Sequence, residues 1–264
     1  MARFCPLFSG SRGNAFYIGS ATAGILIDAG RSAKQLDCAL LASGVDPAAV
    51  KAVFVTHEHS DHIQGLRVFA GRHQIPVYAS CGTLEALAGQ NVLDGRTAAF
   101  AIGSGGVECA GMYITSFSTP HDSRESVGFV VRTADDRSAA VATDLGVMSD
   151  TVRKAAAGCD LVALESNHDV GMLKNGAYPY PLKRRILSER GHLSNEDCAR
   201  ELPALARGGT TRFVLSHLSR ENNLPALAYQ TALCALLEGG MRQGIDFELT
   251  VAGEENREGR AILF

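Results

Sequence analysis

The feature that most constrains this chain is a dense group of histidines and acidic residues placed directly after an apolar segment. The segment Lys51–Thr56 is typical of a buried strand, and the residues after it read His-Glu-His-Ser-Asp-His. In an extended chain His57 and His59 point to the same side, and Asp61 and His62 can face a second position once the chain turns. One short segment can therefore supply ligands to two metal ions, provided that other strand ends lie beside it.

Other predicted strand ends carry suitable ligands. His121, Asp144 and His217 each come at or shortly after the end of a predicted strand. A hydrolytic pair of metal ions lies about 3.5–4 Å apart and needs bridging oxygen ligands as well as imidazoles. Such a ligand set suits zinc best, while manganese, iron or nickel can occupy the same ligands. We therefore predict two divalent cations, with zinc preferred.

A single histidine at a strand end is more often hydrogen-bonded than bound to metal, and we interpret His73 in this way. The same interpretation does not fit the main cluster, because five of the eight histidines follow apolar strands and have acidic residues nearby. A structural zinc site is the other alternative, but such sites prefer cysteine-rich shells, and none of the seven cysteines lies in the cluster. The cysteines form no C-x-x-C pair and are interpreted as reduced thiols.

Short strands and helices recur along the chain in two similar blocks. The first block is predicted to contain strands Phe4–Leu7, Phe16–Ile18, Ile25–Asp28, Lys51–Thr56 and Val77–Ala79, and helices Ala33–Ser43, Gln64–Arg72 and Gly82–Ala88. The second is predicted to contain strands Tyr113–Phe117, Ser126–Arg132, Ser138–Thr143, Leu161–Glu165, Arg212–Ser216 and Phe247–Ala252, and helices Met148–Ala157, Asn195–Ala206 and Leu224–Leu237. This recurrence favours an α/β fold with two sheets packed face to face and helices on both outer surfaces. With 46% hydrophobic residues, the 264-residue chain can bury one such core, and we expect a single domain over residues 1–264.

The charge of the chain limits how it can hold a partner. The net charge is -3 and charged residues make up 20% of the chain, so no global basic field gathers nucleic acid, and an acidic substrate must be held locally. No apolar stretch approaches the roughly 18 residues of a membrane span, and the first residues lack the apolar core of a signal peptide. We expect a cytoplasmic protein with no membrane partner, and no obligate protein partner is inferred.

The motif His-x-His-x-Asp-His after a strand, followed by the later histidines and aspartate, resembles the metallo-β-lactamase fold superfamily over nearly the whole chain. The resemblance implies a four-layer αβ/βα sandwich of two mixed β-sheets flanked by helices. It also implies a distribution of ligands: one metal on His57, His59 and His121, the other on Asp61, His62 and His217, with Asp144 bridging. Asp28, at the end of a predicted strand, would support the site from behind.

Within that superfamily the chain resembles the YycJ/WalJ-type branch. The motifs that carry this resemblance are Ser9–Asn14, Glu165–Asp169, Gly191–Asp197 and Ser216–Asn223. Members of the branch are regarded as nucleases that act on DNA from a 5′ end, so the resemblance implies phosphodiester cleavage. The nucleophile expected for this reaction is a hydroxide that bridges the two metals.

Cleavage of a phosphodiester also needs a proton for the leaving oxygen. His192 is our candidate general acid, oriented by Glu165, and Asp61 is expected to orient the hydroxide or accept its proton. The tRNA-processing branch of the superfamily has a comparable pair, which agrees with this assignment. The alternative is that His192 belongs only to a capping loop, in which Ser194 or Asn195 begins the next helix.

Several residues are candidates for contact with a nucleic-acid substrate. Lys183, Arg184 and Arg185 lie close to two tyrosines and could hold a phosphate backbone, although such a run is usually a solvated surface. Two further pairs are Ser11 and Asn14 in a glycine-rich turn, and His168 and Asn222 in later motifs. Each pair could equally serve to fix its own loop.

Two other functions stay open. A small-molecule hydrolase of the same fold, acting on a cyclic phosphodiester, thioester or lactam, would be favoured by a narrow, closed cleft. A metal-binding regulatory or redox protein without hydrolytic turnover is the second alternative. A di-iron redox site typically replaces one histidine by a carboxylate, and the ligands from His57 to His217 show no such replacement.

Overall fold

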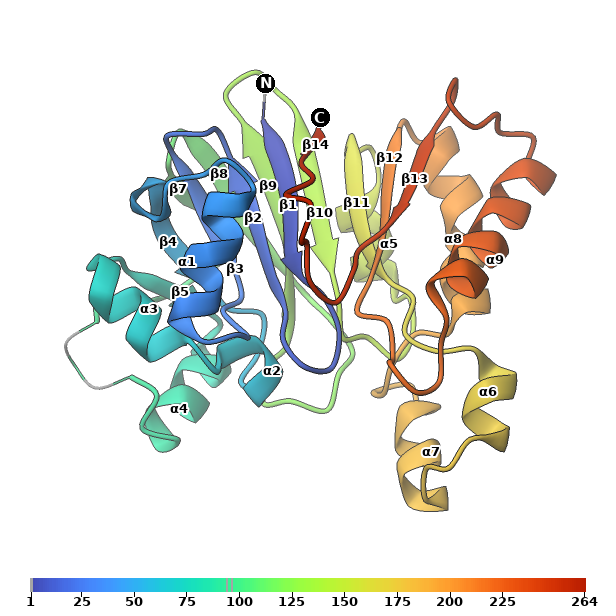
Figure 1. Ribbon diagram of the computed structural model, residues 1–264, viewed down its shortest axis with the longest axis horizontal. Coiled ribbons are helices and arrows are strands. Elements are labelled where there is room, and N and C mark those ends of the chain that lie inside the picture. The colour runs from blue at the N-terminus through green and yellow to red at the C-terminus, as the bar shows by residue number, and fades with distance from the viewer. Residues whose placement is uncertain (1, 94, 96) are drawn as a thin grey trace.

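The computed structural model describes residues 2–93, 95 and 97–264, and in this part of the chain the strands form two mixed sheets (Figure 1). The first sheet contains, in spatial order, β14 (Ile262–Leu263), β1 (Arg3–Phe8), β2 (Ala15–Gly19), β3 (Gly24–Ile27), β4 (Val50–Phe54), β5 (Val77–Ala79) and β6 (Ala99–Ala101). The second contains β13 (Glu248–Val251), β12 (Arg212–Ser216), β11 (Leu161–Glu165), β10 (Ser138–Ala142), β9 (Val127–Thr133), β8 (Met112–Ser118) and β7 (Val107–Cys109).

The two sheets have the same internal design. Strands β14, β1, β2 and β3 pair antiparallel, and β3, β4, β5 and β6 pair parallel. In the second sheet β7, β8, β9 and β10 pair antiparallel, and β10, β11, β12 and β13 pair parallel. Strands buried on both faces read as apolar runs rather than as alternating patterns, which matches the fully buried β10 and β11.

Helices cover the outer face of each sheet (Figure 1). The first sheet packs against α1 (Ala33–Ala42), α3 (Leu66–His73) and α4 (Cys81–Gly89), and the second against α5 (Asp150–Ala156), α8 (Asn195–Arg207) and α9 (Pro225–Glu238). Between the sheets lies a third apolar cluster that includes Phe4, Phe16, Phe54 and Phe129. The four-layer sandwich predicted from the sequence is therefore confirmed.

The shortest elements differ from the prediction. The helix expected at Gln64–Arg72 is α3, which begins at Leu66 after Gly65, and the short helix α2 (Ser60–Ile63) before it was not predicted. A Cβ on Gly65 would lie 1.9 Å from the carbonyl oxygen of Arg31, so this position accepts only glycine. The sequence also gave no signal for β6, β7, β14, the 3-10 turn Pro47–Ala49, α6 (Val170–Asn175) or α7 (Tyr180–Ile186).

Functional groups gather where strands of both sheets end. Asp28 follows β3, the histidine motif follows β4, and further candidates follow β8, β10, β11 and β12. Helices α2 and α7 lie at this end of the sheets, in the lower half of the view in Figure 1. Among the described residues, no helix has the length and apolar character needed to cross a membrane.

Candidate metal centre

Three imidazoles form the first group of candidate ligands. His57 and His59 lie between β4 and α2, and His121 lies in the loop after β8. His59 Nδ1 is 3.0 Å from His57 Nε2 and 3.3 Å from His121 Nε2. The three nitrogens all lie within 4.8 Å of one another. Neutral imidazole nitrogens that converge in this way fit three ligands of a divalent cation such as zinc.

A second group combines imidazoles with carboxylates. Asp61 Oδ2 lies 3.5 Å from Nε2 of both His62 and His217. Asp144 is buried, and its Oδ2 lies 3.1 Å from His62 Nε2 without hydrogen-bond geometry. That oxygen has no hydrogen-bond partner among the described residues. A buried carboxylate oxygen without a partner is costly unless a cation binds it, so these residues fit a second metal.

Asp28 orients His62 from behind. Its Oδ2 accepts a hydrogen bond from His62 Nδ1 at 2.7 Å, while Oδ1 accepts from the backbone N–H of Thr56 at 2.8 Å. The Thr56 hydroxyl also donates to Asp28 Oδ2 and lies 3.0 Å from His57 Nδ1. With Nδ1 engaged, Nε2 of His62 faces the metal position. Burial raises the pKa of Asp28, although His62 beside it acts to lower that pKa.

Glu165 connects a candidate ligand to the candidate general acid. Its Oε1 lies 2.7 Å from His217 Nδ1 and 2.8 Å from His192 Nδ1. Its Oε2 accepts hydrogen bonds from the backbone N–H groups of Leu145 and Leu193. Burial acts to raise the pKa of Glu165, but His192 and His217 outweigh it and lower the pKa to about 2. Glu165 is therefore a carboxylate that fixes both rings. The sequence predicted its contact with His192 but not the one with His217.

The loop before His192 holds His121 in place. The carbonyl oxygen of Gly191 accepts a hydrogen bond from His121 Nδ1 at 3.0 Å. The guanidinium of Arg190 donates twice to the carbonyl oxygen of His121, at 3.1 and 2.9 Å. Next to these, Arg185 pairs with both carboxylate oxygens of Asp122. One segment of chain thus positions a candidate ligand and carries the candidate acid.

Burial and neighbouring charges divide the buried ligands into two kinds. Burial, and next the adjacent His62, lower the pKa of His57. Burial also acts to lower the pKa of His62 and His217, but neighbouring carboxylates, Asp144 foremost, raise both well above the usual value. For Asp61 and Asp144 burial acts to raise the pKa, but the imidazoles outweigh it and lower the pKa of each. The carboxylates of the cluster are therefore ionised.

A cleft of about 330 Å³ opens over these residues. Ser11, Tyr178, Arg185 and His192 line it together with the candidate ligands. Of the substrate contacts predicted from the sequence, Ser11 and Arg185 therefore lie at the metal centre. Arg185 is engaged with Asp122, so a bound phosphate would have to share or displace that carboxylate.

The other predicted substrate contacts do not line this cleft. Asn14 is fully buried, and its amide lies 3.2 Å from Asp61 Oδ2 and donates to the carbonyl oxygen of Gly10, which places it behind the site. Lys183 donates from Nζ to the backbone carbonyl oxygens of Lys174 and Gly176, and Arg184 is exposed. Successive residues of α7 point in different directions, so the basic run does not form one surface.

His168 and Asn222 are buried beside the site. Both ring nitrogens of His168 lack a hydrogen-bond partner among the described residues, and burial lowers its pKa to about 4. The backbone N–H of Asn222 donates to Ser219 Oγ, and its carbonyl oxygen accepts from the N–H of Asp169. These contacts favour the alternative in which Asn222 fixes the loop before α6.

Sequence reasoning missed several residues that hold the candidate ligands. Thr56, Arg190 and Gly191 were not predicted, nor was Asn167, whose amide donates to the carbonyl oxygen of His217 at 2.9 Å. Ser9 Oγ accepts from the backbone N–H of His217 at 2.7 Å. Asn167 and Ser9 lie within motifs quoted above, so their place in a motif was the available signal. A contact made through a backbone carbonyl oxygen, such as that of Gly191 with His121, does not depend on the residue type and cannot be recognised from it.

Comparison with known proteins adds independent findings. The family described as "Beta-lactamase superfamily domain" matches residues 24–218. An exodeoxyribonuclease YycJ of Bacillus anthracis is 37% identical over 250 residues, which cover 93% of each chain. An exodeoxyribonuclease WalJ of Streptococcus pneumoniae is 34% identical over 259 residues, covering 94% of this chain and 93% of that one.

Solved structures agree on the fold. The metallo-beta-lactamase fold protein YhfI from Bacillus subtilis has a TM-score of 0.73 at 16% identity and covers 97% of this chain and 98% of its own. Zn(2+)-bound PqqB from Methylobacterium extorquens has a TM-score of 0.70 at 16% identity and covers 100% of this chain and 99% of its own. At such identities the likeness concerns the arrangement of the elements alone.

Proposed function

The chain belongs to the metallo-β-lactamase superfamily, in the YycJ/WalJ-type branch, and from this premise we propose that it is a two-metal nuclease that removes nucleotides from the 5′ end of DNA. The family together with the exodeoxyribonuclease relatives makes it a metal-dependent hydrolase. The finer proposal concerns the number of metals, the bond that is cleaved and the direction of cleavage.

The observation that carries the proposal is the contact between His192 and Glu165 beside the ligand cluster. A sugar alkoxide is a poor leaving group, so its departure needs a proton donor. Glu165 holds Nδ1 of His192 at 2.8 Å, which leaves Nε2 as the nitrogen available to the cleft. The same carboxylate holds His217, so the donor and the metal centre keep a fixed relation.

The ligand set supports two divalent cations, and zinc suits its imidazoles and carboxylates best, with manganese, iron or nickel as substitutes. The first position would be held by His57, His59 and His121, and the second by Asp61, His62 and His217, with Asp144 shared. When bound, such cations lower the pKa of water and neutralise charge on the attacked phosphate. Asp61 is partly exposed at the cleft and would orient the attacking water and accept its proton.

Two features favour nucleic acid over a small molecule. The relatives that match over nearly the whole chain carry the name exodeoxyribonuclease. The cleft also adjoins a neighbouring cavity, since Ser11, Ser60 and Asp61 line both, whereas a small substrate would favour a closed cleft.

The test compares a natural substrate with one that needs no general acid. The natural substrate is 5′-phosphorylated duplex DNA with added manganese or zinc, and the other is bis-p-nitrophenyl phosphate, whose leaving group departs without a proton. We expect Asp61→Ala to abolish turnover of both. His192→Ala should slow DNA cleavage about 10²–10⁴-fold and leave the activated ester nearly unaffected.

His73→Ala is the matched control, because this histidine lies away from the site and is bonded to Asp37. Progressive loss of nucleotides from the 5′ end of the wild-type substrate would support the direction of cleavage. If the DNA stays intact while the ester is turned over, the proposed nuclease activity is wrong and a small-molecule hydrolase is favoured. If His192→Ala lowers the turnover rate of both substrates by the same factor, His192 does not act as the general acid.

A further inference from the structure

A groove leads away from the metal centre on the side of α3. It is a cavity of about 660 Å³ lined by the Ser9–Asn14 loop, α2, the first turn of α3 and the residues that follow α4, and we call it the α3 groove. Ser11, Ser60 and Asp61 line both this groove and the cleft over the metal centre. The two spaces therefore adjoin along α2, so the groove begins directly beside the metal centre.

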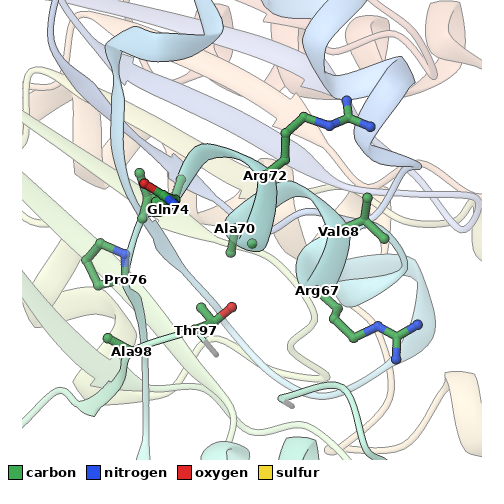
Figure 2. Close-up of a pocket in the computed structure, with 10 residues that line it drawn as sticks. Arg67, Val68, Ala70, Arg72, Gln74, Pro76, Thr97 and Ala98 are labelled. Atoms are coloured by element: carbon green, nitrogen blue, oxygen red, sulfur yellow. The ribbon is translucent and has the colours of Figure 1, made fainter. Parts of the chain in front are cut away.

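Arg67 belongs to the α3 groove but not to the cleft over the metal centre. It lines the groove and also a further cavity of about 850 Å³ on the other side of α3. Figure 2 shows Arg67 projecting from α3 at the border of that cavity, with Thr97 and Ala98 on the segment facing the helix. The hollowed surface thus continues past Arg67.

The charges along the α3 groove suit a polyanion. Arg12, from the Ser9–Asn14 loop, lies 3.7 Å from Glu254, and both side chains are largely exposed, so that ion pair is weak and exchangeable. Arg67 forms no ion pair with any residue that the structure describes. It also lies in the first turn of α3, where a positive side chain is unfavourable beside the helix N-terminus. An anion bound between the two arginines would offset that repulsion.

The remaining groove residues are compatible with a backbone of phosphates and sugars. Gln64, Gln90 and Asn91 offer amide donors and acceptors. Among the described residues that line the groove, Asp61 alone is acidic, and it lies at the metal end. The negative charge of the groove therefore lies beside the proposed cation sites, and the rest of its lining is positive or neutral.

The opposite side of the cleft offers less free positive charge. Lys183 is engaged with two backbone carbonyl oxygens, and Arg185 is paired with Asp122. Within the described part of the chain, Arg184 is the one residue of that run whose side chain forms no hydrogen bond or ion pair. The basic run singled out by the sequence is thus a weaker path for a polyanion than the α3 groove.

We propose that the DNA strand carrying the scissile phosphate lies in the α3 groove, with Arg12 and Arg67 against its backbone phosphates. This inference rests on the proposed function, because it takes DNA as the substrate. It implies that affinity depends on strand length, since a dinucleotide at the metals would not reach Arg67, whereas an oligonucleotide would. It also assigns the groove to phosphate recognition independent of base sequence.

The experiment uses the metal-loaded protein and one double variant, Arg12→Gln with Arg67→Gln. Turnover of bis-p-nitrophenyl phosphate reports on the metal centre alone, and oligonucleotides of two and twelve nucleotides are added as competitors. Cleavage of the twelve-nucleotide strand is followed in parallel. The control is Arg132→Gln, which removes one positive charge from an equally exposed ion pair, with Asp136, at the end of β9 remote from the site.

The double variant should turn over the ester like the wild type and bind the dinucleotide equally well. Its inhibition constant for the longer strand should rise about tenfold, and the salt dependence of binding should flatten by roughly 1.4 in the log–log slope, as expected for two lost single-strand phosphate contacts. The Arg132→Gln protein should show neither change.

Three results would overturn the inference. If the longer strand is cleaved and binds the double variant as tightly as the wild type, the α3 groove is not the path, although the nuclease stands. If ester turnover falls in parallel with strand binding, the arginines support the metal centre instead. If the wild-type protein neither binds nor cleaves the longer strand while it turns over the ester, the proposed function fails together with the inference.

Discussion

At the scale of single residues, the buried histidines differ in their pKa, which is lowered for some and raised for others. Burial, and next the neighbouring His62, keep the pKa of His57 low, so that ring is neutral and ready to bind a cation. For His62 and His217, carboxylates led by Asp144 outweigh burial and keep the pKa high. Without metal these two rings therefore hold protons at neutral pH, and a metal ion must displace them.

This difference predicts a pH-dependent affinity. A raised pKa means that the proton is bound at every pH below it, so metal affinity should fall as pH falls and rise as pH rises. We expect roughly one to two protons to be released when zinc binds the metal-free protein at neutral pH. Calorimetric titration in two buffers of equal pH but different ionisation enthalpy measures this number directly. Identical heats in both buffers would contradict the prediction.

Residue type and spacing were enough to select the candidate ligands, but not to describe what holds them. The motif at residues 57–62 stands out because three imidazoles in six residues are rare without a metal. The carbonyl oxygen of Gly191, which accepts from His121, belongs to the backbone, and backbone groups are the same at every position. Asn14 was predicted as a substrate contact because it lies in a glycine-rich turn, whereas its amide points to Asp61.

At the scale of elements, several strands end on a residue with left-handed backbone. Asp28 follows β3 with φ of 60°, Asp144 follows β10 with φ of 57°, and His217 follows β12 with φ of 55°. This conformation ends sheet pairing and is strained for most residues, although aspartate and histidine tolerate it better than others. Hydrogen bonds from Thr56 to Asp28 and from the N–H of His217 to Ser9 help to hold it. A functional residue at a strand end is visible in the sequence, but its backbone angle is not.

The loops beneath Asp61 pack so closely around Gly30 that a side chain there should destabilise the protein. The N–H of Gly30 donates to the carbonyl oxygen of Asn14, and the N–H of Asn14 donates to that of Asp61. A Cβ on Gly30 would lie 1.7 Å from the Asp61 carbonyl oxygen, so Gly30→Ala must push these loops apart. We expect a loss of about 1–3 kcal/mol in the free energy of unfolding, measured with urea, and a larger fractional loss of hydrolysis than of folded protein.

Gly103→Ala is the matched control, because an added Cβ there meets nothing within 4 Å. Its stability should stay within about 0.5 kcal/mol of the wild type. A Gly30→Ala protein with unchanged stability and activity would show that the loops are looser than these contacts indicate.

Elements with a clear hydrophobic pattern were predictable, and short irregular ones were not. The predicted strand Leu161–Glu165 coincides with β11, because a fully buried strand is a continuous apolar run. All residues of β6 are exposed, so it has no such pattern. Helix α7 begins at Tyr180 with Pro181 in its first turn, a position where proline is favourable although it is commonly read as a helix breaker.

At the scale of the whole molecule, both sheets contribute to one site. The first sheet supplies His57, His59 and His62 from the segment after β4, and the second supplies residues after β8, β10 and β12. The recurrence of strands and helices predicted two sheets but not their strand order. The edge strand β14 pairs with β1, so that Leu263 lies opposite Arg3. A strand of two residues is too short for its sequence to predict which strand it pairs with.

Because the candidate ligands come from both sheets, bound metal should stabilise the molecule as a unit. A ligand that binds only the folded state adds RT ln(1 + [L]/Kd), which is about 4 kcal/mol when free metal is a thousand times Kd. For a chain of this size that corresponds to roughly 8–16 °C in Tm. Scanning calorimetry before and after chelation should therefore show a fall of about this size, reversed by added zinc.

The same measurement distinguishes a metal that joins the sheets from one held by a single loop. Asp144→Ala removes the carboxylate that we propose to be shared by the two metals, and the remaining ligands that we propose from the second sheet are His121 and His217. Chelation should then lower Tm much less than in the wild type, whereas His73→Ala should respond as the wild type does, because His73 is hydrogen-bonded to Asp37 and is not a candidate ligand. A full chelation effect in Asp144→Ala would mean that the metal is held without this carboxylate, and the second sheet would contribute to the site through its imidazoles alone.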